Sequence, residues 1–198
     1  MDPLAQLRDH YQQLVEQLPA PARTAYQAAS RREVLPKGYY LCRQGAVCQH
    51  VGRLESGSAR VFRLQGAAEV TTAFLFAGDF VTSFQSFYLQ VPSPSAIQLM
   101  EESEVTLLGY GALQQLKDAY PEINRIDRLS NDYYTMWLEQ RLFSLQFHPA
   151  RRRYEELLRQ EPHLLQKVPL GYIASYLGIT QETLSRIRAK RDERESDW

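Results

Sequence analysis

Residues 170–189 read LGYIASYLGITQETLSRIRA, and this stretch has the spacing of two short helices joined by a tight turn. Ala174 is small enough for a second helix to approach, and Gly178 accepts the positive φ that such a turn needs. Thr180 is placed to cap the second helix, with Thr183 one turn further on. The angle between the helices would be filled by apolar residues, namely Ile173, Leu177, Ile179, Leu184 and Ile187. The stretch therefore predicts a helix-turn-helix.

The outward face of the second predicted helix, 180–190, carries polar and basic side chains that suit the major groove of DNA. An arginine can pair with guanine, a glutamate with the cytosine amino group and a glutamine with adenine. Lysine or arginine contacts to phosphates would add affinity without sequence information. A solvated, charged helix face is the alternative interpretation for any single residue. The candidate DNA-binding residues are Thr180, Gln181, Glu182, Thr183, Ser185, Arg186, Arg188 and Lys190.

Positive charge is concentrated in this stretch, although the chain of 198 residues has 23 basic and 23 acidic residues. Within 180–191, four basic residues stand against one acidic residue.

Hydrophobic residues make up 44% and charged residues 23%, as in ordinary globular domains, and no apolar run is long enough for a membrane span. Cys42 and Cys48 are too few for a disulfide scaffold or a four-cysteine cluster. We therefore expect a cytoplasmic protein without a membrane partner.

Histidines and cysteines do not suggest a cofactor either. The four histidines, His10, His50, His148 and His163, have no pair at metal-ligand spacing. Buried thiols are the simpler interpretation of Cys42 and Cys48, against partial ligation of a cluster across a dimer. We therefore expect no metal, haem or other cofactor.

In the first half of the chain, the sequence pattern changes from one typical of a helix to one typical of short strands. Apolar residues repeat at helical spacing over 4–30, where Pro19 and Pro21 interrupt the pattern. Between 36 and 110, regularly placed glycines cut the chain into short pieces rich in Tyr, Val, Phe and Thr. The clearest of these predicted strands are 59–64, 70–76 and 104–108. Short strands at regular spacing predict a β-barrel or jelly-roll-like module.

A long helix is predicted over 121–147, and its apolar arc is broader than one packing face needs. One stripe comprises Ile126, Leu129, Tyr133, Met136, Gln140, Phe143 and Phe147. A second stripe comprises Leu138, Leu142 and Leu145. We expect one stripe to pack on the β-module and the other to pair with a second copy, which makes a homodimer. Burial of both stripes within one chain is the alternative.

Proline ends that helix at His148-Pro149, which is a candidate domain boundary and hinge. Three shorter helices are predicted beyond it, over 150–160, 170–177 and 180–190. Only the polar segment 192–198 follows, and we expect it to be frayed.

Taken in this order, the parts resemble the Crp/Fnr family of bacterial transcription regulators. KGYYLCRQG at 37–45, LESGSARVF at 54–62 and AGDF at 77–80 are similar to the turns of the family's β-roll. ASYLGITQETLSRI at 174–187 is similar to its helix-turn-helix, and is the more specific motif. The resemblance implies that Glu182 and Arg186 contact bases.

The resemblance also implies an α+β fold in three parts. The first, 1–120, is a double-stranded, jelly-roll-like effector domain of the cyclic-nucleotide-binding type with flanking helices. The second, 121–147, is a dimerisation helix. The third, 149–198, is a small all-α, winged-helix-like DNA-binding domain whose wing is reduced, because so little chain follows the recognition helix.

The sequence departs from the family at the cyclic-AMP phosphate site. GDFVTS places Thr82 and Ser83 where cyclic-AMP-binding members have Gly-Glu, and VPSPSA places Pro94 at the start of their Arg-Ser-Ala. No basic residue occurs between 80 and 100, and a buried phosphate without a counter-charge is costly. We therefore expect no physiological binding of cyclic AMP or cyclic GMP.

A pocket in this region would suit a small neutral or apolar effector, unless its residues simply form core. The residues that would line it are Ser83, Phe84, Phe87, Tyr88 and Ser95.

These observations predict a homodimeric, sequence-specific regulator that reads a palindromic site in double-stranded DNA, with RNA polymerase as a further candidate partner. An unidentified effector, or none, would control it. One alternative is a degenerate ligand-binding module that acts through protein contacts. A metal-dependent, cupin-like enzyme is less favoured, since only His50 lies in the β-region. We expect no enzymatic activity.

Overall fold

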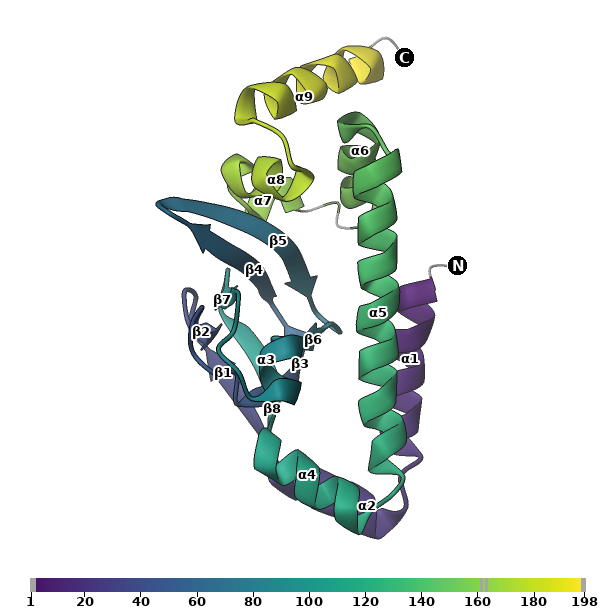
Figure 1. Cartoon of the computed structure of the whole chain (residues 1–198). Helices are drawn as coiled ribbons and strands as arrows, with labels where there is room; N and C mark the ends of the chain where they lie inside the picture. The colour runs from purple at the N-terminus through teal and green to yellow at the C-terminus, as the bar shows by residue number, and fades with distance from the viewer. Residues whose placement is uncertain (1–2, 161, 163, 197–198) are drawn as a thin grey trace. The chain divides into compact units, whose positions relative to one another are not determined.

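The computed structural model describes residues 3–160, 162 and 164–196 (Figure 1). Two helices open the chain, α1 (Pro3–Glu16) and α2 (Ala20–Ala29). Pro19 is the N-cap of α2, so the expected interruption of the first helical stretch is confirmed. Tyr11 of α1 packs edge-on against Phe80, with ring centroids 4.7 Å apart.

Within the described residues eight strands follow, in two antiparallel sheets of four. Figure 1 shows their arrangement. One sheet has the order β1-β8-β3-β6 and the other β2-β7-β4-β5. The predicted strands 59–64, 70–76 and 104–108 lie within β4, β5 and β8, which confirms the jelly-roll-like module. The bounds are β1 (Ser30–Leu35), β2 (Tyr40–Cys42), β3 (His50–Ser56), β4 (Ser58–Gln65), β5 (Ala68–Phe76), β6 (Phe80–Val81), β7 (Ala96–Leu99) and β8 (Ser103–Gly109).

The core of the β-module lies between the two sheets, because alternate residues of each strand point to opposite faces. Leu54 of β3 and Val105 of β8 pair in register and are fully buried. Phe87 and Ile97 belong to the same cluster and are at most 1% exposed. Burying side chains of this size stabilises the module by roughly 1.5–3 kcal/mol each.

The helices beyond β6 bear out the predicted α+β class. The long predicted helix is α5, which begins two residues later than expected, after the turn at Pro121. The last helix, α9, continues to Ser196, so the expected frayed end at 192–198 is wrong as far as 196, because this polar segment contains no glycine or proline. Residues 197–198 lie outside the described residues. The bounds are α3 (Phe84–Leu89), α4 (Tyr110–Ala119), α5 (Ile123–Phe147), α6 (Ala150–Gln160), α7 (Leu164–Lys167), α8 (Leu170–Leu177) and α9 (Gln181–Ser196).

The chain divides into two compact units. The first comprises Met1–Val61 and Phe74–Glu139, and the second comprises Phe62–Ala73 and Gln140–Trp198. The second unit therefore joins the outer part of the β4–β5 hairpin to the C-terminal helices. Within it, the amide of Thr71 donates a hydrogen bond to Ser175 Oγ at 2.9 Å. Among the helices that the structure describes, none combines the length and hydropathy needed to cross a membrane.

Candidate functional site

Two helices and a tight turn form the candidate site in the second unit. Gly178 follows α8 with φ +67°, the left-handed conformation expected for it. Its amide donates to the Ser175 carbonyl, and the Ile179 amide donates to the Ala174 carbonyl, each at 3.0 Å. Thr180 Oγ1 then accepts from the Thr183 amide at 3.2 Å, which caps α9 as predicted. The turn and cap of the predicted helix-turn-helix are confirmed.

Apolar side chains hold the two helices at this turn. Ile173, Leu177 and Leu184 are fully buried, and Ala174 is 2% exposed where the helices approach each other. Ile179 and Ile187 are half-buried. Replacing one of these fully buried leucines by alanine would cost about 2–5 kcal/mol, so the orientation of α9 is fixed by packing.

Replacing Gly178 by alanine is expected to destabilise the chain by about 1–2 kcal/mol, because a left-handed conformation is unfavourable for a residue with a Cβ. No heavy atom lies within 4 Å of the position that the Cβ would take, so no clash adds to this cost. Gly178→Asn is the control, since asparagine tolerates this conformation better. Thermal unfolding of the three full-length chains measures the effect. Equal unfolding temperatures for glycine and alanine would contradict it.

Two arginines fasten the end of α8 to other parts of the second unit. Arg153 donates 2.7 Å hydrogen bonds to the carbonyls of His148 and Leu177. Arg141 donates to the Tyr176 carbonyl and lies over the Tyr176 ring, 3.8 Å from its centroid. Sequence reasoning missed both arginines, because an arginine within a helix normally indicates an exposed face. A positive charge also suits the carbonyl end of a helix.

The candidate recognition side chains lie along one accessible side of α9. Gln181, Glu182, Ser185 and Arg186 are exposed, as is Thr180 before the helix. Thr183 and Arg188 are half-buried, and the side chain of Lys190 lies outside the described residues. A hydrogen bond with the Thr180 side chain lowers the pKa of Glu182, so the carboxylate stays ionised and able to accept hydrogen bonds.

The residues of the predicted effector pocket lie on and around α3, where they contact other protein groups. Phe87 is fully buried in the core. Phe84 stacks on Tyr134 of α5, with ring centroids 3.9 Å apart. The Tyr88 hydroxyl donates to Asp127 Oδ1 at 2.8 Å, and burial raises the pKa of Tyr88. These three aromatic rings are therefore occupied by partners of the same chain.

Serines bond to one another beside α3. Ser93 Oγ lies 2.8 Å from Ser83 Oγ and donates to the Ser95 carbonyl at 2.7 Å. The Ser95 amide donates back to Ser93 Oγ at 3.2 Å. Ser93 itself, which sequence reasoning did not single out, is 2% exposed and joins the other two. Whether these residues bind an effector remains a prediction.

The candidate metal ligands interact with other protein groups, and the Cys42 and Cys48 thiols are hydrogen-bonded to each other. Cys42 and Cys48 are both buried free thiols, and the Cys48 amide donates to Ser86 Oγ at 2.8 Å. His50 lies 3.0 Å from an Arg31 nitrogen. His148 Nδ1 lies 3.0 Å from Glu156 Oε2. Within the part of the chain that the structure describes, no three histidine, cysteine or carboxylate side chains cluster as a metal site would require; His163 lies outside that part.

Comparisons with known proteins agree with this architecture. Residues 32–120 match the family model of the cyclic nucleotide-binding domain. A protein from Eubacterium rectale, described as a candidate transcriptional regulator of the Crp/Fnr family, shares 17% identity over 93% of this chain and 88% of that chain, with a TM-score of 0.70. The chain has the Crp/Fnr fold. The resemblance inferred from the motifs is confirmed.

Two further solved structures share the Crp/Fnr fold. FixK2 from Bradyrhizobium japonicum is 16% identical, covering 84% of this chain and 86% of that chain with a TM-score of 0.69. The Thermus thermophilus Catabolite Activator Protein is 22% identical, covering 92% and 87% with a TM-score of 0.52. The search of curated proteins found no match. At these identities the likeness concerns the fold.

Proposed function

We propose that the chain is a homodimeric transcription regulator that reads a palindromic DNA site with α9, and that neither cyclic AMP nor cyclic GMP controls it. The observation that carries the proposal is the exposed row Gln181, Glu182, Ser185 and Arg186 on a helix whose orientation is fixed by a capped turn and a buried core. A Crp/Fnr fold supports a regulatory role, and we propose no catalytic one.

The chemistry of this row supports major-groove recognition. Arg186 is the residue best suited to bidentate pairing with guanine, and its side chain is exposed. Glu182 is ionised and suits the cytosine amino group. Gln181 suits adenine. Because three different base-edge chemistries occur on one face, sequence-specific binding is favoured over purely electrostatic attraction to phosphates.

The exposed face of α5 supports the homodimer. Leu142, Phe143 and Phe147 are 56%, 53% and 66% exposed, and Leu138 and Leu145 are each 43% exposed. By contrast Ile126, Leu129 and Tyr133, in the first half of the predicted stripe, are buried against their own chain. An exposed leucine row at i, i+4 and i+7 is the seam that a second helix covers. To read a palindrome, the dimer would have to hold its two recognition helices roughly 34–36 Å apart, one turn of DNA.

Selection of random duplex DNA by the purified, ligand-free chain tests the proposal. We expect an enriched palindrome, with binding that weakens steeply when the enriched site is titrated at a second, higher salt concentration. An enriched site without two-fold symmetry would contradict the dimeric arrangement. Weak, salt-sensitive binding without any enrichment would contradict sequence-specific recognition by the ligand-free protein.

Cyclic AMP and cyclic GMP are expected to produce no saturable heat when titrated into the full-length chain. Ser83 stands where a ribose-binding glutamate would be and Pro94 where a phosphate-binding arginine would be, and the nearby serines already bond to one another. A buried phosphate would therefore lack a counter-charge from the 80–100 segment. A cyclic-AMP-binding protein in the same buffer is the positive control. Saturable binding with one nucleotide per chain would contradict this expectation.

A further inference from the structure

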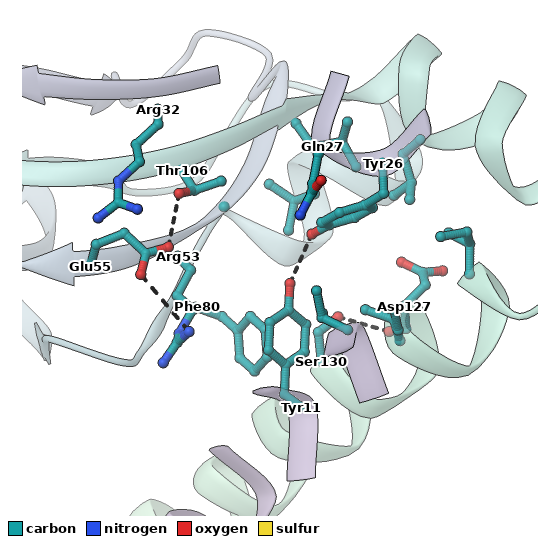
Figure 2. Close-up of a pocket in the computed structure, with 17 residues that line it drawn as sticks. Tyr11, Tyr26, Gln27, Arg32, Arg53, Glu55, Phe80, Thr106, Asp127 and Ser130 are labelled. Carbon is teal, nitrogen blue, oxygen red and sulfur yellow. Dashed lines mark hydrogen bonds and ion pairs between the residues drawn. The ribbon is translucent and has the colours of Figure 1, made fainter. Parts of the chain in front are cut away.

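A cavity outside the α3 region lies on the outer face of the β1-β8-β3-β6 sheet. It is partly open, has a volume of about 280 Å³, and is lined by residues of β1, β3, β6 and β8 and of α1, α2, α4 and α5. Figure 2 shows the residues that line it. Strand alternation explains its position, since Val51, Arg53 and Glu55 point to this face while Leu54 points into the core. None of the five residues predicted to line an effector pocket contributes to its walls.

The walls are mostly apolar, and the volume is close to the lower end of the roughly 300–1,000 Å³ range of ligand sites. Gln27 and Arg32, both exposed, lie at the edge of the cavity. A small organic molecule is therefore the size of ligand that fits. The apolar lining includes Val15, Phe80, Leu108, Leu113, Ile123 and Ile126.

Every charged side chain that the structure places on the lining has an opposite charge beside it. Arg53 lies 3.9 Å from Glu55, whose other oxygen accepts from Thr106 Oγ1 at 2.8 Å (Figure 2). Arg32 pairs with Glu104 at 2.6 Å, and Asp127 pairs with Lys117. A charged ligand would have to compete with one of these pairs to be neutralised. The electrostatics therefore favour a neutral ligand.

A pair of phenols supplies the polar group of the cavity. The hydroxyls of Tyr11, on α1, and Tyr26, on α2, lie 2.9 Å apart and point toward each other in Figure 2. Burial raises the pKa of both tyrosines, so both hydroxyls remain protonated. Two hydroxyls carry two hydrogens, and their mutual bond uses one. Ser30 is a further side-chain hydrogen-bond partner of Tyr26. When Tyr26 donates to Tyr11, the Tyr11 hydroxyl keeps its own hydrogen for an acceptor on a ligand.

We propose that this cavity binds a small neutral molecule with an apolar ring system and one carbonyl or hydroxyl oxygen, which accepts a hydrogen bond from the Tyr11–Tyr26 pair. Such a ligand would also touch Ile123 and Ile126 on α5, the helix on which the exposed leucine row lies. Binding to the cavity is independent of whether the chain binds DNA, so the two proposals are tested separately.

Three naphthalene derivatives of nearly equal size test the site on the full-length chain. Acetylnaphthalene is neutral and carries a carbonyl acceptor, isopropenylnaphthalene replaces the carbonyl oxygen by carbon, and naphthoate carries a negative charge. Calorimetric titration is expected to show acetylnaphthalene binding roughly 5-fold more tightly than isopropenylnaphthalene, the worth of one hydrogen bond. Naphthoate should bind most weakly.

Matched variants locate the binding. The double variant Tyr11→Phe with Tyr26→Phe should lose the preference for the acetyl compound, whereas Tyr110→Phe, a half-buried tyrosine that does not line the cavity, should keep it. Val15→Trp places a large ring toward the cavity and should abolish binding of all three compounds. Circular dichroism checks that each variant folds. If a variant does not fold, the comparison of the three compounds on the unaltered chain still tests the proposal. Tightest binding of naphthoate, no preference for the acetyl compound, or unchanged binding to Val15→Trp would each overturn the proposal.

Discussion

Arg186→Ala is expected to weaken binding to the selected DNA site by about 100-fold or more, while binding to unrelated DNA changes little. Arg186 is exposed on the recognition face of α9, and a bidentate arginine–guanine pair discriminates between bases by about 1–3 kcal/mol. In the proposed dimer the substitution is present twice, so both half-sites lose the contact. Fluorescence anisotropy with the selected site, and with a duplex in which the candidate guanines are replaced, measures the loss.

Arg186→Lys separates recognition from charge. Lysine keeps the positive charge but lacks the planar fork that pairs with guanine O6 and N7. We therefore expect Arg186→Lys to lose most of the specificity and to retain the salt dependence of binding. If Arg186→Ala bound the selected site as tightly as the unaltered chain, base recognition by this residue would be wrong. If both variants weakened binding to all DNA equally, Arg186 would instead be a phosphate contact.

Leu142→Glu is expected to convert the proposed dimer into monomers at concentrations where the unaltered chain is dimeric. Leu142 is 56% exposed, in the middle of the row formed with Leu138 and Leu145. Burial of a leucine from each copy contributes roughly 3 kcal/mol or more, or about 100-fold in the dissociation constant. Two carboxylates brought together at a two-fold axis would add repulsion. Analytical ultracentrifugation measures the change, and affinity for the palindrome should fall with it.

Gln115→Glu is the control for the added charge. Gln115 is exposed on α4, outside the leucine row, so the same added negative charge should leave the oligomeric state unaltered. A monomeric unaltered chain would contradict the dimer, and so would a Leu142→Glu variant that stays dimeric.

The local parts of the candidate site could be predicted from the sequence. The left-handed turn at Gly178 and the cap at Thr180 depend on residues adjacent in the chain, and both are confirmed. The buried positions Ile173, Leu177 and Leu184 follow from helical spacing alone. The strands of the β-module could also be predicted, because the glycines that separate them mark turns between residues close in the chain.

Long-range contacts could not be predicted, because the local sequence pattern does not indicate which distant residues come together in the fold. The Arg153 side chain donates a hydrogen bond to the Leu177 carbonyl, 24 positions away in the chain. The Thr71 amide donates one to Ser175, 104 positions away. The cavity on the outer face of the sheet also needs distant residues, since its phenols come from α1 and α2 and its ion pair from β3. The resemblance to the family directed the expected effector pocket to the residues around α3, whose side chains pair with one another.

The hydrogen bond between Thr71 and Ser175 bears on how this protein can be divided for experiments. The unit that carries α8 and α9 is assembled from two separate stretches of chain, 62–73 and 140–198. A fragment cut at Gln140 or at Pro149 would lack the hairpin residues, and Ser175 Oγ would lose both the Thr71 amide and the Glu69 carbonyl as partners. Gene fusions and truncations that keep only the C-terminal helices would therefore remove residues 62–73, which belong to the same compact unit.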